Sequence, residues 1–117
     1  MFQKEAAAQR AVVEYCKLRK IKIVAIPNGG KRNAREAYFL KLEGVSAGFP
    51  DLFVPELCSC YGGLFIELKV GKNKPTKAQQ DWIDYLNYAG YLAVVCYGHL
   101  EAIKEIDKYC GCGYRKS

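Results

Sequence analysis

The sequence predicts an α/β protein in which helices flank a mixed β-sheet. First, segments with apolar residues three and four positions apart alternate with short segments rich in β-branched and aromatic residues. Second, residues 64–70 place apolar side chains at every other position, as a strand with one core face does. Third, residues 91–97 form a continuous apolar run, which is typical of a strand covered on both faces. The length of 117 residues leaves room for a single domain.

The first half of the chain is expected to form a helix, a strand and a second helix. Residues 2–19 have helical spacing of apolar residues, at Phe2, Ala6, Val13 and Cys16. Residues 21–26 are rich in Ile and Val and end at a turn sequence, which predicts a strand. Residues 34–43 are expected to form a short helix that ends at Gly44. The apolar side of this helix consists of Tyr38, Phe39 and Leu42.

The second half is expected to form a hairpin, a helix, a strand and a last helix. The turn at residues 48–51 leads into a strand at residues 52–54, and Gly62 and Gly63 favour a hairpin to residues 64–70. Thr76 is expected to cap a helix that runs to about residue 89 and ends at Gly90. Its buried side is expected to consist of Trp82, Ile83, Tyr85 and Leu86. A strand at residues 91–97 and a helix at residues 100–110 complete one domain, residues 1–110, followed by a short tail, residues 111–117.

The net charge of +6 comes from 18 Lys and Arg against 12 Asp and Glu, and it is concentrated in two segments. Residues 17–35 and residues 69–77 contain no acidic residue. Their basic side chains include Lys31, Arg32, Arg35, Lys72, Lys74 and Lys77. Such segments suit a polyphosphate such as nucleic acid, although charge alone is equally compatible with a solvated basic surface.

The sequence does not predict a membrane protein. No apolar run approaches the roughly 18 residues that a membrane-spanning helix needs. Lys4, Glu5 and Arg10 interrupt the alanine-rich N-terminus, where a signal peptide would need an apolar segment. We therefore expect a cytoplasmic protein without a membrane partner.

The six cysteines are interpreted mainly as structural residues. Cys16 and Cys96 lie within apolar periodic segments, where a thiol packs as a small hydrophobic group. The remaining four form two Cys-x-Cys pairs, Cys58 with Cys60 and Cys110 with Cys112. Structural zinc sites usually separate paired cysteines by two to four residues, so this spacing argues against zinc.

Asp51, Glu67 and Lys69 are the candidate catalytic residues. Phosphodiester hydrolysis needs an activated water molecule and stabilisation of charge on the phosphate, and a Mg²⁺ ion held by oxygen ligands can supply both. Glu67 and Lys69 are two residues apart on one strand, so they project from the same face about 7 Å apart. Asp51 opens the preceding strand, where a hairpin can place it beside Glu67. The alternative is an exposed strand face with an ordinary Glu–Lys salt bridge.

Three more polar residues lie on otherwise apolar helix faces. Glu5 and Gln9 lie within the apolar stripe of the first helix, which directs them toward the sheet. Because a buried carboxylate needs a partner, Glu5 is a candidate metal ligand, directly or through water; a frayed, exposed first turn is the alternative. Gln79 shares a face with apolar residues, but Thr76-x-x-Gln79 also has the spacing of a capping box. His99, the single histidine, is interpreted as a surface residue.

Together these residues resemble the Pro-Asp…(Asp/Glu)-x-Lys nuclease superfamily, and within it the small stand-alone form of the virus-type replication-repair nuclease (VRR-NUC) family. The resemblance spans nearly the whole chain, and the ordered set of motifs carries it because a bare Glu-x-Lys is unspecific. The set consists of Glu5 and Gln9, Pro27-Asn28-Gly29, Gly44-Val45, Gly48-Phe49-Pro50-Asp51-Leu52, Phe65-Ile66-Glu67-Leu68-Lys69, Thr76-Lys77-Ala78-Gln79 with Trp82, and Gly90-Tyr91. The Cys-x-Cys pairs lie outside this pattern.

The resemblance implies a restriction-endonuclease-like mixed sheet with helices on it. It further implies that Asp51, Glu67 and the backbone carbonyl of Leu68 hold Mg²⁺ or Mn²⁺ and that Glu5 assists. Lys69 would then serve the nucleophile, and Gln79 would position water or phosphate. Small stand-alone relatives look like homodimers that act on four-way DNA junctions, whereas the same domain appended to larger repair proteins acts on flaps.

The leading functional hypothesis is a Mg²⁺-dependent, structure-selective DNA endonuclease, a homodimeric Holliday-junction resolvase in the cytoplasm of a bacterial or phage-infected cell. The basic residues from Lys31 to Arg35 and from Lys72 to Lys77 would contact the phosphates of branched or duplex DNA. One alternative is a non-catalytic basic nucleic-acid-binding module. The other is a nuclease that acts on flaps or on plain duplex DNA.

Overall fold

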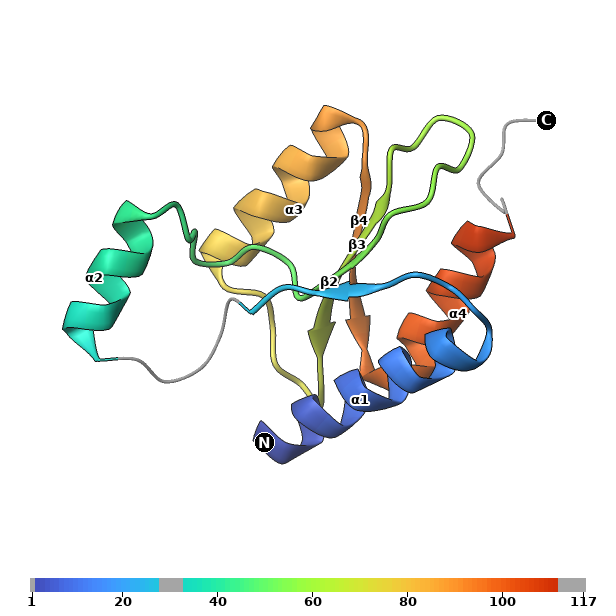
Figure 1. Ribbon diagram of the computed structural model, residues 1–117, viewed down its shortest axis with the longest axis horizontal. Coiled ribbons are helices and arrows are strands. Elements are labelled where there is room, and N and C mark those ends of the chain that lie inside the picture. The colour runs from blue at the N-terminus through green and yellow to red at the C-terminus, as the bar shows by residue number, and fades with distance from the viewer. Residues whose placement is uncertain (1, 28–32, 112–117) are drawn as a thin grey trace.

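A four-stranded mixed sheet forms the centre of the computed structural model, which describes residues 2–27 and 33–111 (Figure 1). The elements follow in the expected order: α1 (Phe2–Leu18), β1 (Val24–Ala25), α2 (Ala34–Leu42), β2 (Leu52–Val54), β3 (Leu64–Lys69), α3 (Lys77–Ala89), β4 (Leu92–Tyr97) and α4 (Gly98–Cys110). The strand order is β1-β2-β3-β4, with antiparallel pairing except between β3 and β4, which are parallel. The predicted α/β class with a mixed sheet is confirmed.

Helices cover both faces of the sheet, α1 and α4 on one side and α3 on the other (Figure 1). Apolar residues of α1 and α4 pack against Leu64, Ile66 and Leu68 of β3. The α3 residues Ile83 and Leu86 pack in a second cluster around Phe65. The predicted alternation of β3 is therefore confirmed, and it places Glu67 and Lys69 on the same face as Phe65.

The buried stripe of α1 differs from the predicted one. Its buried residues are Ala8, Val12 and Cys16, whereas Ala6 is exposed. The stripe is rotated because positions 5, 8, 9, 12 and 16 share one helical face, the face that meets the sheet. Glu5 and Gln9 lie on this face and are half-buried, as expected from the sequence.

The first strand is shorter than the predicted range of residues 21–26. The two residues of β1 pair only with Phe53 and Leu52 of β2. The Ile21 N–H instead donates to the carbonyl oxygen of Cys16, which closes the end of α1. Since β2 itself has three residues, a six-residue first strand could not be paired along its whole length.

The predicted apolar face of α2 is exposed, and one residue of the predicted buried face of α3 is exposed as well. The helix α2 contains no buried residue, and Tyr38, Phe39 and Leu42 are 60%, 47% and 66% exposed. On α3, Ile83 and Leu86 are buried and Trp82 is half-buried, but Tyr85 is 56% exposed. Periodicity correctly predicts both helices, but it does not distinguish a face that meets this chain's core from one that remains exposed.

Other expectations concern the cysteines, the C-terminus and the membrane. Cys16 and Cys96 are buried core residues, as predicted. Cys112 and the rest of the predicted tail from residue 112 lie outside the described residues. No helix within residues 2–27 and 33–111 is both long enough and apolar enough to cross a bilayer.

Candidate active site

Asp51 precedes the first residue of β2 and is held by backbone bonds on both sides. Its N–H donates to the Ile66 carbonyl oxygen at 3.1 Å, and its own carbonyl oxygen accepts from the Ile26 N–H at 2.8 Å. Pro50, which is fully buried, has no amide hydrogen with which to continue the strand ladder. The paired backbone therefore ends at Asp51.

The Asp51 side chain also contacts β3, beyond the end of the backbone pairing between β2 and β3. Its Oδ2 accepts a hydrogen bond from the Leu68 N–H at 2.9 Å. Since β2 and β3 are antiparallel with Leu52 opposite Ile66, Leu68 lies past the last paired residue of β3 on this side. A carboxylate thus replaces the missing backbone acceptor, and this hydrogen bond fixes the Asp51 carboxylate beside Glu67.

Glu67 and Lys69 are 3% and 8% exposed, and they are the buried charged residues of the described part of the chain. The Lys69 Nζ lies 3.7 Å from Glu67 Oε2, and Gln79 Nε2 donates to the same oxygen at 3.2 Å. The other oxygen, Glu67 Oε1, is buried without a hydrogen-bond partner among the described residues. An unpartnered buried carboxylate oxygen is costly, so this site needs either a proton shared between the Glu67 and Asp51 carboxyl groups or a cation.

The two neighbouring carboxyl groups raise the cost of negative charge in this site. Burial raises the pKa of Glu67 to about 8; the charge of Asp51 adds to the rise, Lys69 opposes it, and the charge of Glu5 adds a smaller increase. Burial also raises the pKa of Asp51, against the lowering effect of the Leu68 hydrogen bond. The free site thus disfavours a second negative charge, and a bound cation would offset that cost.

A divalent cation fits this arrangement. Asp51 and Glu67 supply hard oxygen ligands, and Glu67 Oε1 lacks the partner that a cation would provide. Within residues 2–27 and 33–111, no three His, Cys, Asp or Glu side chains form a metal-binding group by themselves. The remaining ligands would therefore be backbone oxygen, water or phosphate, as is usual for Mg²⁺.

Gln79 combines both roles that the sequence allows, and it does so in one conformation. Its Oε1 accepts from the Thr76 N–H at 2.9 Å, which completes a capping box at the start of α3, while its Nε2 holds Glu67. Gly48, which belongs to the motif that carries the family resemblance, lets the preceding loop approach this helix end. A Cβ atom at Gly48 would lie 2.7 Å from the Ala78 carbonyl carbon, and its φ of +87° also favours glycine.

The other predicted residues do not all join this centre. Glu5 is half-buried and contributes to the raised pKa of Glu67, so its charge acts on the site. Arg35 is exposed on α2, and its guanidinium lies over the Phe39 ring. The side chains of Lys72, Lys74 and Lys77 are exposed in the β3–α3 connection and the first turn of α3.

Some predicted residues lie outside the acidic site, and one of its contacts was not predicted. Lys31 and Arg32 lie outside the described residues. His99 is exposed in the first turn of α4, as expected of a surface residue. The role of the Leu68 amide was not predicted, because the spacing of residues along the chain does not show that the Asp51 carboxylate accepts from this strand N–H.

The fold and the site together define a class of protein. A mixed sheet that gathers an Asp, a Glu-x-Lys and a helix Gln at one end of its central strand is a nuclease domain of the Pro-Asp…(Asp/Glu)-x-Lys type. Residues 3–100 match the VRR-NUC domain, and the chain belongs to this family. VRR-NUC domains are nuclease domains that generally depend on metal ions, and nuclease activity implies binding of nucleic acid.

The comparison with solved structures agrees with this assignment. A structure described as a VRR_NUC domain protein is 33% identical to this chain and has a TM-score of 0.82. The similarity covers 93% of this chain and 89% of that one. The curated proteins contain no significant match.

Proposed function

We propose that this chain is a Mg²⁺-dependent, structure-selective DNA endonuclease that acts as a homodimeric Holliday-junction resolvase. The observation that carries the proposal is the buried Glu67 Oε1, which has no hydrogen-bond partner in the described chain and lies in a site with a second carboxylate and a lysine. An ordinary surface salt bridge would leave both groups solvated, whereas Glu67 is 3% exposed. Burial thus favours the catalytic interpretation over the salt-bridge alternative.

In this proposal Asp51, Glu67 and the Leu68 carbonyl oxygen hold Mg²⁺ or Mn²⁺, and Glu5 assists directly or through water. When bound, the cation lowers the pKa of a water molecule and stabilises negative charge on the phosphate. The Leu68 N–H fixes the Asp51 carboxylate in place. The contacts of Glu67 Oε2 with Gln79 and Lys69 leave Oε1 for the cation.

Lys69 and Gln79 act on the reacting groups from the same face of the sheet. The buried Lys69 ammonium stabilises charge that develops on the phosphate and orients the attacking water. Gln79 positions the Glu67 carboxylate, and through it water or phosphate. The carboxylates of the site disfavour approach of a phosphate, so the cation and Lys69 must offset them before DNA is bound productively.

Exposed basic residues supply the contacts to DNA in this proposal. Lys72, Lys74 and Lys77 immediately follow the strand that carries Glu67 and Lys69, so phosphates near the cleaved bond would meet them. Arg35, Lys31 and Arg32 complete the proposed set. A homodimer would present two such sites to the two strands of a branched duplex.

A cleavage panel tests this proposal. End-labelled four-way junction, flap and linear duplex are incubated with the protein in Mg²⁺ and, separately, in EDTA. We expect paired nicks that resolve the four-way junction, only in Mg²⁺, and slower cutting of the other substrates. Preferential cutting of the flap or the duplex would show that this DNA, and not the four-way junction, is the preferred substrate. Binding without cutting of any substrate would support a non-catalytic nucleic-acid-binding module.

A further inference from the structure

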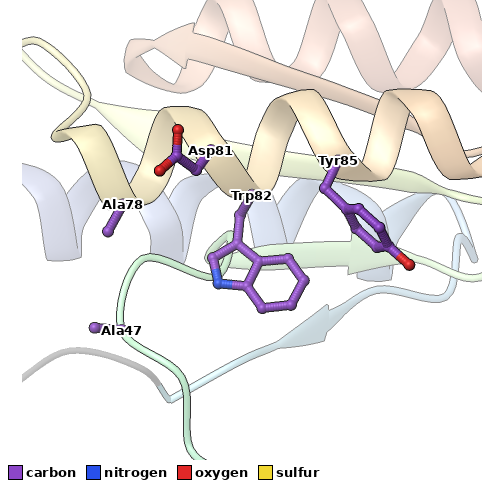
Figure 2. Close-up of a pocket in the computed structure, with 5 residues that line it drawn as sticks. All are labelled: Ala47, Ala78, Asp81, Trp82 and Tyr85. Atoms are coloured by element: carbon purple, nitrogen blue, oxygen red, sulfur yellow. The ribbon is translucent and has the colours of Figure 1, made fainter.

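A pocket of about 450 Å³ lies between α3 and the loop that enters β2 (Figure 2). Its walls are Ala47, Ala78, Asp81, Trp82 and Tyr85. Trp82 and Tyr85 project from α3 on the same side, toward the loop that carries Ala47 (Figure 2). The volume falls within the range of about 300–1,000 Å³ that small-ligand sites occupy.

The pocket and the acidic site share their two supporting segments. Ala78 precedes Gln79 on α3, and Ala47 is four residues before Asp51 in the loop that enters β2. These segments touch at Gly48, where an added Cβ would lie 2.8 Å from the Gln79 nitrogen. The pocket is therefore next to the residues proposed to bind the cation, across this close backbone approach.

The aromatic wall of the pocket is held in position. The Trp82 indole N–H donates to Ser46 Oγ at 3.1 Å, and the ring meets Phe49 edge to face with centroids 4.9 Å apart. Trp82 and Tyr85 also meet edge to face, with centroids 5.9 Å apart. The face of the Trp82 ring, held in this way, is a flat surface on which an aromatic ligand can stack with little loss of side-chain entropy, and Tyr85, at 85° to it, can contact the edge of that ligand.

The charge of the pocket favours a nucleobase over a phosphate as the group bound inside it. Asp81 is the acidic group among the lining residues, and Lys77 pairs with it at 3.0 Å on the exposed rim. The carboxylate disfavours a phosphate inside the pocket, yet it can accept a hydrogen bond from the amino group of a base. The neighbouring Lys77 suits the attached backbone phosphate outside.

We propose that this pocket binds an unpaired nucleobase of the DNA strand next to the cleaved phosphate, stacked on Trp82 with Tyr85 against its edge. The inference rests on the proposed nuclease function and narrows its substrate to DNA with an unstacked nucleotide near the cut. A perfect duplex keeps its bases stacked and must first supply the free energy of unstacking, whereas a branch point offers such a base at lower cost.

The test measures binding in EDTA, so that it does not depend on cleavage. The probe is a four-way junction with one unpaired 2-aminopurine nucleotide at its branch point. Tyr85→Ala removes the edge contact to the base, and Ala47→Leu fills the pocket while both rings remain. Tyr88→Ala is the control because Tyr88 is 87% exposed on the same helix and does not line the pocket, although its ring centroid lies 6.4 Å from that of Tyr85.

Wild type and Tyr88→Ala are expected to quench the 2-aminopurine fluorescence on binding. Tyr85→Ala and Ala47→Leu should quench less and bind this junction about tenfold more weakly, with unchanged affinity for linear duplex. Equal quenching by all four proteins would overturn the inference. The inference would also be overturned if both pocket variants became monomeric while the 2-aminopurine quenching stayed unchanged. The pocket would then be a contact with a second copy of the chain and not a base-binding site. A wild type that quenches but never cleaves would overturn the proposed function and leave the pocket assignment standing.

Discussion

At the scale of single residues, the site depends on two carboxyl groups that burial disfavours as anions. Asp51 and Glu67 are neighbours, and burial raises the pKa of both, that of Glu67 to about 8. A structural site would gain from replacing such a pair by neutral groups, whereas a cation site needs the charge. We therefore expect the Asp51 and Glu67 carboxyl groups to lower the stability of the metal-free protein and to provide its affinity for a metal ion.

In EDTA, the stability of the protein should fall as pH rises because of Glu67. The folded-state pKa of Glu67 lies above its ordinary value of 4.5, so folding retains a proton that the unfolded chain releases. The associated stability is complete below the ordinary value and is lost as pH rises through about 8. Between about pH 5.5 and pH 8.5, Tm of the wild type should fall more steeply than Tm of Glu67→Gln.

Thermal unfolding by circular dichroism at several pH values gives the comparison, and other titrating groups cancel between the two proteins. Mn²⁺ should restore the high-pH Tm of the wild type and leave that of Glu67→Gln nearly unchanged, because bound cation favours the ionised carboxylate. Parallel pH profiles in EDTA would show that Glu67 is not the group that carries the raised pKa.

At the scale of elements, the start of α3 links helix stability to the acid pair through one side chain. Gln79 accepts from the Thr76 N–H and donates to Glu67 Oε2. The two functions use different atoms, so a variant can separate them. A glutamate at position 79 preserves the capping box, since Glu serves as well as Gln at this position, but it has no N–H to donate.

We therefore predict that Gln79→Glu retains the helix content of the wild type but cleaves at least about tenfold more slowly, because it removes a donor to Glu67 and adds a like charge. Gln79→Ala should lose both the capping hydrogen bond and activity. Single-turnover rates and circular dichroism measure the two effects. Wild-type cleavage by Gln79→Glu would mean that the Gln79 amide has no part in the site.

The helix α2 presents apolar residues that the rest of the described chain does not bury. Tyr38, Phe39 and Leu42 are 47% exposed or more, although a capping box forms at Asn33. A helix of nine residues is marginal in water unless a partner packs on it. The proposed homodimer supplies such a partner.

In sedimentation, the wild type should have twice the chain mass of 13.2 kDa, and the double variant Tyr38→Ser/Leu42→Ser should approach the single mass. Leu100→Ser is the control, because Leu100 is 72% exposed on α4. Equal masses for the wild type and the double variant would exclude α2 as a dimer contact. A monomeric wild type would contradict the homodimer itself.

The sequence predicts elements better than it predicts contacts between them. The alternation of β3 and the caps of α3 are local signals, and both are confirmed. The length of β1 depends on how much partner strand β2 offers, and the exposure of Tyr85 depends on where the loop before β2 lies; neither is a local property. The sequence shows Glu67 and Lys69 only as polar residues that alternate with apolar ones on a strand. Their burial follows from the packing of helices on both faces of that strand, which is not a local property.

At the scale of the whole molecule, the chain combines a net charge of +6 with a negative centre. Under the proposed function, the excess positive charge would attract DNA from solution, while the acidic site would accept a phosphate only when a cation compensates it. Non-specific affinity and cleavage should therefore respond to different residues, and salt should act mainly on the first.

Replacement of Lys72, Lys74 and Lys77 by Gln should weaken binding to junction and duplex alike. The slope of log K against log salt should decrease by about 0.9 for each phosphate that no longer pairs with a lysine. Lys104→Gln is the control, because Lys104 is exposed on α4. Fluorescence anisotropy over a salt series measures both quantities. An unchanged slope in the triple variant would place the DNA backbone elsewhere on the molecule.

The central claim, that Asp51, Glu67 and Lys69 form a metal-dependent nuclease site, is tested most directly by the single-turnover cleavage rate of Lys69→Ala on a four-way junction in Mg²⁺. Junction affinity in EDTA and Tm accompany the rate, and Asp51→Asn serves as a second, isosteric variant. The predicted result is a rate at least about 100-fold below that of the wild type, with junction affinity retained. Cleavage by folded Lys69→Ala at the normal rate would contradict the claim.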